Sequence, residues 1–269
     1  MYKLVALDID GTLLDKNRNI SLKTGYVLKQ ISKLAKVLLI SSRMPAAMRY
    51  IQEECGISKE PLVAYNGGLI MHKEKILSQT VIELEVLNDI LEINSKLGVH
   101  LSLFHNDEWY APQQDYWSKR EINNTRVQPV FKSNKEVLEN WTLEQKAPHK
   151  IMCMGEASKI DELYQSLVEK FEDKIHLYRS KSTYIEIAPK QISKLSGVHT
   201  IINEIHKGIE LKNVVAYGDN FNDIEMLENV GLGVAVANAK QEVLQIADQL
   251  TSSNVDDGVA IHLEKIFKL

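Results

Sequence analysis

The sequence predicts an α/β protein: a doubly wound parallel sheet into which a smaller α+β module is inserted. In the first and last thirds of the chain, short apolar runs alternate with helical patterns, and the connections are short. Such alternation implies parallel strands with helices on both faces of the sheet. The middle third instead alternates apolar with polar residues, which is typical of strands with one exposed face. All three tryptophans lie in this middle third.

The N-terminal elements follow from apolar runs and helical spacing. The run from Lys3 to Leu7 ends in an acid and suits a buried strand, whereas Val27, Leu28 and Ile31 recur at helical spacing. Pro45 stands where proline is tolerated, at the start of a helix. In order, we expect a strand at 3–7, a helix at 24–34, a strand at 37–40, a helix from 45, a strand at 62–65, a turn at 66–68 and a hairpin at 69–77.

The remaining elements follow from the same two patterns. In the last third we expect a helix at 195–205, a strand at 214–217, a helix at 222–229, a strand at 232–236, and helices at 240–247 and 259–267. In the middle we expect strands at 99–105, 150–154 and 184–187, and helices at 86–97 and 160–171. The predicted domains are a core formed by residues 1–82 and 189–269, and an insertion formed by residues 83–188.

Composition excludes several classes of protein. The 269 residues carry a formal net charge of −4, which argues against a generally basic nucleic-acid binder. Cys55 and Cys153 are too few for a disulfide framework or a four-thiolate zinc site, so we expect a reducing, cytoplasmic compartment. There is no apolar run of about 18 residues, so we expect no membrane span. Asp8 and Asp10 interrupt the first apolar run, which argues against a signal peptide.

The most informative segment is Asp8-Ile9-Asp10-Gly11-Thr12, which directly follows the first strand. In open α/β sheets, ligands bind beyond the carboxyl ends of the strands. Two carboxylates there suit a magnesium ion, or an aspartate nucleophile beside a general acid. The alternative is a pair of surface acids in a turn.

A second acidic segment, 218–223, follows the strand at 214–217. Asp219 lies at the end of that strand, and Asp223 comes four residues later, near the start of a helix. Asn222 or Asp223 could cap that helix, and this role is compatible with a metal role. Because clustered carboxylates repel one another, a divalent cation is the natural partner for the two segments.

Groups that could bind an anion are also present. Ser41 ends the strand at 37–40 and precedes the Pro45 helix, where its hydroxyl and nearby N–H groups could hold a phosphate oxygen. Ser41 and Ser42 could equally cap that helix. Lys194 begins a helix and could neutralise phosphate charge, although an isolated lysine is usually a solvated surface residue.

Taken together, these segments resemble the haloacid dehalogenase superfamily, and within it the Cof-type, subfamily IIB, sugar phosphatases. The resemblance covers nearly the whole chain. Asp8 to Thr12 resembles the DxDGT motif, and Gly218 to Asp223 resembles the GDxxND motif. Ser41 and Lys194 match the second and third motifs, and Asn66-Gly67, Asn238-Ala239 and 257–260 are similar to further landmarks. The resemblance implies a Rossmann-like core and an inserted cap of the C2B type.

The resemblance also implies roles for these residues. Asp8 would become an aspartyl-phosphate, and Asp10 would act as general acid and base. Ser41, Ser42, Lys194, Asn66 and Gly67 would bind the phosphoryl group. The implied Mg²⁺ ligands are Asp8, the backbone carbonyl of Asp10, Asp219 and, directly or through a second layer, Asp223, with Asn222 and Asn238 supporting these loops.

The chain departs from the family pattern in three places. Ser41-Ser42-Arg43 stands where the family usually has Thr-Gly-Arg, Gln191 to Leu195 changes the surroundings of the lysine, and Val236-Ala237 replaces Met-Gly. No catalytic group is lost, but these departures weaken the transfer of any particular relative's substrate preference.

Residues of the insertion could contact the leaving group of a substrate. Arg179, Tyr184 and Trp117 are candidates by residue type, although most aromatics in such a module belong to its core. Arg179 could meet a second anionic group or lie in a solvated turn. The histidines in this region show no metal-ligand spacing and are expected to be ordinary surface or interface residues: His100, His105, His149 and His176.

The sequence therefore predicts a magnesium-dependent phosphatase acting on a small phosphorylated metabolite, with sugar phosphates as the first class to test. Cofactor phosphates such as pyridoxal phosphate or flavin mononucleotide stay open. A phosphomutase and a non-catalytic phospho-ligand sensor are the alternatives. We expect no nucleic-acid or membrane partner, and a monomer or weak homo-oligomer.

Overall fold

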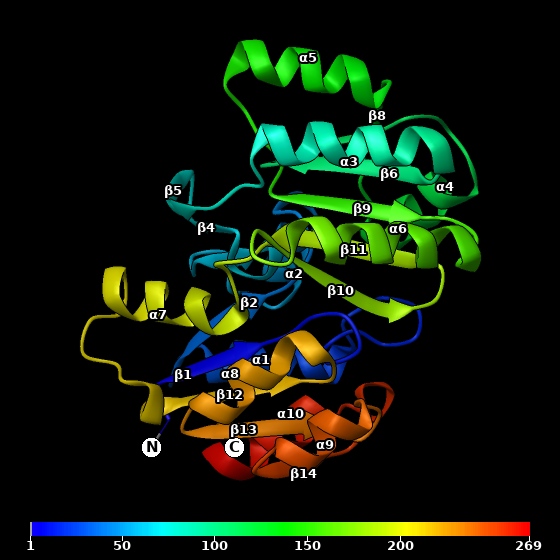
Figure 1. Cartoon of the computed structure of the whole chain (residues 1–269). Coiled ribbons are helices and arrows are strands. Elements are labelled where there is room, and N and C mark those ends of the chain that lie inside the picture. Colours follow the sequence, from blue (N-terminus) through cyan, green and yellow to red (C-terminus); the bar gives the residue numbers. More distant parts are fainter. Residues whose placement is uncertain (1) are drawn as a thin grey trace. The chain divides into compact units, whose positions relative to one another are not determined.

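The computed structural model describes residues 2–269, which fold into two compact units (Figure 1). The first unit is Met1–Ser78 together with Ser193–Leu269, and the second is Gln79–Ile192. The second unit therefore extends four residues beyond each end of the insertion expected at 83–188.

The first unit is built on an eight-stranded sheet of order β14-β13-β12-β1-β2-β3-β4-β5. In this sheet β1 pairs in parallel with β12 on one side and β2 on the other, while β4 runs antiparallel to β3. The neighbouring strands β4 and β5 are the expected hairpin. The strands are β1 (Leu4–Leu7), β2 (Lys36–Ile40), β3 (Leu62–Ala64), β4 (Leu69–His72), β5 (Lys75–Gln79), β12 (Val214–Gly218), β13 (Leu232–Val236) and β14 (Gln249–Thr251).

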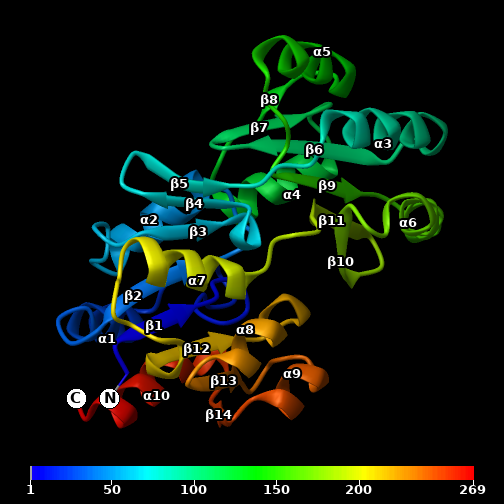
Figure 2. The ribbon, with the colours of Figure 1, turned by 60° about the vertical axis from the view of Figure 1, so that its left-hand side comes forward.

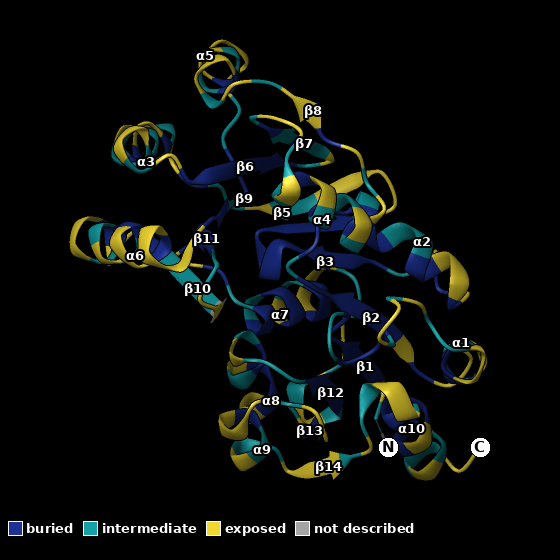
Figure 3. Ribbon diagram, turned by 90° about the vertical axis from the view of Figure 1, so that its right-hand side faces the viewer, coloured by how far each residue is buried: buried dark blue, intermediate teal, exposed yellow. Residues whose placement is uncertain are grey.

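Helices cover both faces of this sheet, as the alternating pattern predicts (Figure 3). Leu4 and Ala6 point to the face that packs against Val198 and Ile201 of α7. Because side chains alternate along a strand, Val5 and Leu7 point to the opposite face, and both are fully buried. One face carries α7 (Lys194–Glu204), α8 (Ile224–Asn229) and α9 (Gln241–Ile246), and the other carries α1 (Leu22–Ile31), α2 (Ala46–Glu54) and α10 (Gly258–Phe267).

The second unit is a six-stranded sheet of order β10-β11-β9-β6-β7-β8, mostly antiparallel (Figure 2). Its apolar core joins α3 and α6 to one face of the sheet. No helix within residues 2–269 is both long and apolar enough to cross a membrane. The elements are α3 (Leu84–Leu97), β6 (His100–His105), β7 (Glu108–Ala111), α4 (Tyr116–Thr125), β8 (Val130–Phe131), α5 (Asn134–Glu144), β9 (Lys150–Met154), α6 (Ala157–Phe171), β10 (Ile175–Lys181) and β11 (Tyr184–Pro189).

Several elements escape prediction because their buried faces carry little apolar signal. Helix α4 buries Ser118, Glu121 and Thr125, which are polar. Helix α5 buries only Val137 and Trp141 among its eleven residues. Helix α4 therefore shows no apolar periodicity, and α5 offers only one apolar pair spaced four residues apart.

The histidines of the second unit were expected to be surface or interface residues, but three of them are buried inside the unit. His100, His105 and His149 are all buried. The ring of His105 bonds to the carbonyl of Ala147 at 2.7 Å, and that of His149 bonds to the carbonyl of Thr80 at 3.0 Å. These bonds satisfy the rings inside the unit, so histidine here is a structural residue.

Candidate active site

Three neighbouring strands of the first unit present polar side chains where they end. Asp8 follows β1, Ser41 follows β2 and Asp219 follows β12. Because β12, β1 and β2 are adjacent and parallel, these residues meet at one edge of the sheet. The strand that follows β1 in the chain, β2, lies on one side of β1, whereas β12 lies on the other side. Open α/β sheets bind ligands at such a point, where the strand order reverses.

Lys194 joins two of the carboxylates. It is the first residue of α7, and its Nζ lies 2.5 Å from Oδ1 of Asp8 and 2.6 Å from Oδ1 of Asp223. The side chains of Lys194 and Asp223 are fully buried, and that of Asp8 is 8% exposed. The default reading of Lys194 as a solvated lysine is therefore wrong, because two carboxylates compensate its buried charge.

Asp223 also holds the loop that contains Asp219. Its Oδ2 accepts hydrogen bonds from the backbone N–H groups of Asp219 and Asn220, each at 3.0 Å. Asn220 is the N-cap of the short turn before α8, so Asp223 has a capping role as well as its contact with Lys194.

Gly11 leaves room for the carboxylate of Asp219. A Cβ on Gly11 would lie 2.3 Å from Oδ2 of Asp219. The φ angle of Gly11 is +89°, a backbone conformation that is strained for any residue with a side chain. Oδ1 of Asp219 accepts a hydrogen bond from the hydroxyl of Thr12 at 3.1 Å. The Asp-Gly-Thr sequence therefore brings the loop after β1 directly against the loop after β12.

Burial and crowding change the protonation of this cluster. Burial, with the nearby negative charge of Asp223, raises the pKa of Asp8 to about 6, although Lys194 opposes the rise. Burial, with the charges of Asp8 and Asp223, raises the pKa of Asp219 to about 8. Burial opposes the charge of Lys194, but the two carboxylates outweigh it and raise its pKa above the ordinary value.

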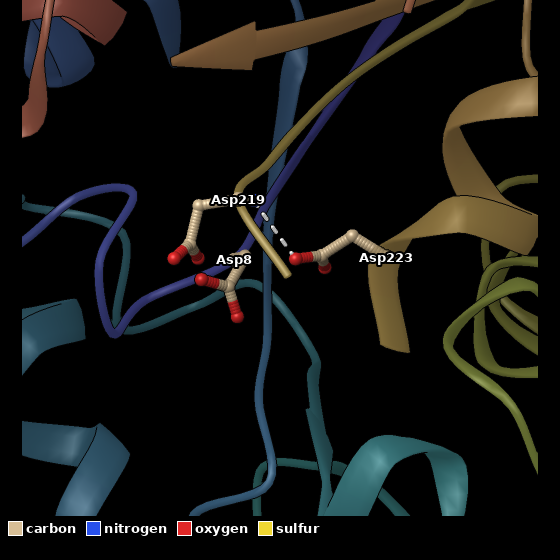
Figure 4. A group of neighbouring side chains, drawn as sticks. All are labelled: Asp8, Asp219 and Asp223. Atoms are coloured by element: carbon tan, nitrogen blue, oxygen red, sulfur yellow. Dashed lines mark hydrogen bonds between the residues drawn. The ribbon is translucent and has the colours of Figure 1, made fainter. Parts of the chain in front are cut away.

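The cluster fits a divalent cation. One oxygen each from Asp8, Asp219 and Asp223 can be chosen so that all lie within 4.8 Å of one another (Figure 4). Oδ2 of Asp8 is buried with no hydrogen-bond partner, which is costly unless a ligand satisfies it. Hard carboxylate oxygens are the donors that Mg²⁺ prefers.

A second loop packs beside Ser41. The hydroxyl of Ser41 accepts a hydrogen bond from the N–H of Arg43 at 3.2 Å, and its carbonyl accepts from the N–H of Asn66 at 2.8 Å. Asn222 donates from its amide to Oδ1 of Asn66 at 3.0 Å.

A Cβ on Gly67 would lie 2.4 Å from the carbonyl oxygen of Ser193, so this glycine lets the loop approach the start of α7. Ser42 is half-buried beside Ser41.

Asn238 pins the loop after β1 from another direction. Its amide donates to the carbonyl of Gly11 at 2.7 Å, and its Oδ1 accepts from the N–H of Asn254 at 2.9 Å. Asn254 in turn donates to the carbonyl of Leu14 at 2.6 Å. Two asparagines thus hold the backbone that follows Asp10.

The side chain of Asp10 lies outside the carboxylate cluster. Its two oxygens accept from Arg43 and Arg18. Sequence reasoning missed both arginines, although Arg43 lies only two residues after Ser41 and was available as a signal.

The three remaining candidates belong to the second unit. Arg179 pairs with Asp161 and donates to the carbonyl of Ser182 at 3.2 Å. The guanidinium of Arg120 lies 6.0 Å from the ring centre of Tyr184 and 5.7 Å from that of Trp117. Trp117 also lines a cavity of about 430 Å³ together with Val99, His100, Gln113, Asp115 and Lys159.

Comparison with known proteins gives a consistent result. A family model described as haloacid dehalogenase-like hydrolase matches residues 5–263. A protein of Haemophilus influenzae, provisionally named a phosphatase, is 34% identical over 277 residues that cover 99% of each chain. A haloacid dehalogenase-like hydrolase from Bacteroides thetaiotaomicron has a solved structure similar to this one, with a TM-score of 0.90, 27% identity and coverage of 99% of this chain and 100% of the other. A structure named as a subclass IIB sugar phosphatase of the same superfamily has a TM-score of 0.83 at 22% identity and covers 99% and 100% of the two chains, which shows a shared fold.

Proposed function

We propose that this chain, which belongs to the haloacid dehalogenase-like hydrolases and is a phosphoric monoester hydrolase of their Cof type, uses Asp8 as a nucleophile on small phosphorylated metabolites. The observation that carries the proposal is the group formed by the buried residues Asp8, Lys194 and Asp223 with the half-buried Asp219, at the carboxyl ends of the strands. Sugar phosphates are the proposed substrate class, supported by the likeness to a structure named as a sugar phosphatase.

In this proposal Asp8 attacks phosphorus, and the bond to the leaving oxygen breaks as an aspartyl-phosphate forms. Lys194 contacts Asp8 directly, so its charge favours the ionised nucleophile. Lys194 and the hydroxyl of Ser41 then stabilise charge on the oxygens of the phosphoryl group, with Ser42, Asn66 and Gly67 shaping that side of the site.

Asp10 transfers the protons. It donates a proton to the leaving oxygen in the first step, and takes one from water in the second, when water attacks the aspartyl-phosphate. Its carboxylate is 36% exposed, whereas that of Asp8 is 8% exposed, so the two acids occupy environments suited to different roles.

Asp8, Asp219 and the backbone carbonyl of Asp10 are the proposed Mg²⁺ ligands. Both oxygens of Asp223 already contact Lys194 or backbone N–H groups, so we assign Asp223 to the layer behind the ion. When bound, the ion would offset the like charges of Asp8 and the phosphate. Asn222 and Asn238 hold the surrounding loops.

The second unit is proposed as the cap that selects the leaving group. Trp117 lines a cavity within this unit, and Tyr184 lies near the same arginine, Arg120. Arg179 already pairs with Asp161, so an anionic group on a substrate would have to replace that pair. A cytoplasmic location is proposed from the free, buried thiols of Cys55 and Cys153.

The test is phosphate release from p-nitrophenyl phosphate and from a panel of hexose phosphates, pyridoxal phosphate and flavin mononucleotide, with and without Mg²⁺. Asp8→Asn is the inactive variant, and Asp173→Asn, at an exposed aspartate of the second unit, is the matched control. Metal-dependent release by the native chain and the control, but not by Asp8→Asn, supports the proposal. Equal release by Asp8→Asn contradicts it, and isomerised sugar phosphate without free phosphate indicates a mutase.

A further inference from the structure

The carboxylate of Asp10 is held by two arginines. Arg43 donates hydrogen bonds to both oxygens of Asp10, from Nε to Oδ2 at 2.6 Å and from Nη2 to Oδ1 at 2.8 Å. Arg18 adds a contact from Nη1 to Oδ1 at 2.7 Å. A two-pronged contact from a planar guanidinium fixes the plane of a carboxylate as well as its position, which a lysine cannot do.

Arg43 is itself rigidly anchored. Its side chain is only 4% exposed, and its third nitrogen, Nη1, donates to the carbonyl of Ala47 at 3.2 Å and to the hydroxyl of Tyr50 at 3.0 Å. Its backbone carbonyl accepts from the N–H of Tyr65, and its own N–H donates to Ser41. Arg43 therefore ties the side chain of Asp10 to helix α2 and to the loops after β2 and β3.

The two arginines differ in a way that separates their roles. The side chain of Arg18 is 38% exposed and belongs to the turn at 15–19, whereas Arg43 is buried. Burial opposes the charge of Arg43, but the hydrogen bonds and charge of Asp10 raise its pKa above the ordinary value, so Arg43 stays a cation. Arg43 is thus the fixed member of the pair.

We propose that Arg43 is a positioning residue that orients the carboxyl group of Asp10 for proton transfer to the leaving oxygen, an inference that rests on the proposed phosphatase function. As the bond between phosphorus and the leaving oxygen breaks, the proton of Asp10 moves to that oxygen and Asp10 becomes a carboxylate. The fork of Arg43 matches that carboxylate. When water attacks the phosphorus of the aspartyl-phosphate, a proton of that water passes to Asp10 and the bond between Asp8 and phosphorus breaks.

The inference predicts a dependence on the leaving group. Phenyl phosphate and p-nitrophenyl phosphate have similar shapes, but phenol resembles a tyrosine side chain, with a pKa of about 10, so its phenolate ion leaves poorly without a proton. The p-nitrophenolate ion is much more stable and needs little proton donation. Comparing kcat/KM for the two compounds isolates the first step, because kcat/KM does not include the later hydrolysis of the aspartyl-phosphate.

The experiment compares the native chain with Arg43→Lys, which keeps the charge and loses the fork. We expect kcat/KM for phenyl phosphate to fall about 10- to 100-fold more than kcat/KM for p-nitrophenyl phosphate, because misplacing Asp10 forfeits part of a general-acid contribution that is typically about 10²- to 10⁴-fold. Asp10→Asn should show the same bias at least as strongly. Arg49→Lys, on the same helix α2, is the matched control and should leave the ratio unchanged.

A second variant covers the case in which Arg43→Lys does not fold. Tyr50→Phe leaves Arg43 in place and removes one of its anchors, so it should produce a smaller bias in the same direction. Equal losses on both compounds in folded Arg43→Lys, or no bias in Tyr50→Phe, overturn the positioning role while leaving the phosphatase intact. A native chain that hydrolyses neither these aryl phosphates nor the metabolite panel overturns the proposed function itself, and the inference with it.

Discussion

Replacing Lys194 with methionine tests how the buried cluster is balanced. The substitution keeps much of the side-chain volume but removes the ammonium group. In the described contacts this group is the one cation that bonds to both carboxylates, at 2.5 Å from Oδ1 of Asp8 and 2.6 Å from Oδ1 of Asp223. Breaking a buried ion pair typically costs about 3–5 kcal/mol, because the remaining charge is left uncompensated. For a protein of this size each kcal/mol lowers Tm by about 2–4 °C, so a fall of about 6–20 °C is expected near neutral pH.

The loss should depend on pH in a defined direction. In the native chain burial already raises the pKa of Asp8 to about 6 even with Lys194 beside it. Without the lysine this carboxyl is protonated more readily, and the neutral form is cheaper to bury. The destabilisation should therefore be smaller at pH 5.5 than at pH 8.

Thermal unfolding of the metal-free protein, followed by circular dichroism, measures this effect. The matched control is Lys207→Met, which removes an exposed lysine of the same unit and should change the free energy of unfolding by no more than about 0.5 kcal/mol. A Lys194→Met protein as stable as the control, or one destabilised equally at pH 5.5 and 8, would refute the reasoning.

Three further predictions concern the metal and the loops around it. Burial raises the pKa of Asp8 to about 6 and that of Asp219 to about 8, from the ordinary value of 3.8. The folded, metal-free protein therefore favours the protonated form of both groups, and the stability that this form contributes is lost as the pH rises through those two values. Protons then compete less with Mg²⁺, and calorimetry and melting curves should show tighter binding and a larger stabilisation at pH 8 than at pH 6; the reverse order would contradict this. Gly11→Ala places a Cβ 2.3 Å from Asp219 and should weaken Mg²⁺ binding at least about tenfold by calorimetry, whereas unchanged affinity would show that the loop can shift. Asn238→Ala removes the hydrogen bond to Gly11 and the one that Asn238 accepts from Asn254, at about 0.5–1.5 kcal/mol each, so chemical denaturation should show a loss of about 1–3 kcal/mol; no loss would mean that Asn254 holds the loop through Leu14 alone.

Residues at strand ends were predictable because strand direction determines where they lie. Once 3–7 and 214–217 are read as parallel strands, Asp8 and Asp219 must lie at the same edge of the sheet. The doubly wound core followed from the same alternation and is confirmed. Local pattern is sufficient here because each carboxylate directly follows its own strand.

The burial of Lys194 was not available from local pattern. Its partner Asp8 is 186 residues away, and only the packing of α7 into the apolar core on one face of the sheet brings them together. The grip of Arg43 on Asp10 is likewise a tertiary contact, across 33 residues. Helix α4 escaped for a different reason, because its buried face is polar and carries no hydrophobic period.

The most direct test of the central claim is a search for phosphate on Asp8. The native chain is mixed with p-nitrophenyl phosphate and Mg²⁺, quenched in acid within one turnover, digested and analysed by mass spectrometry, with Asp8→Asn treated in parallel. The account predicts a phosphoryl group on the peptide that contains Asp8 in the native chain and none in the variant. Phosphate released at the native rate by Asp8→Asn, or a phosphoryl group found on another residue, would contradict it.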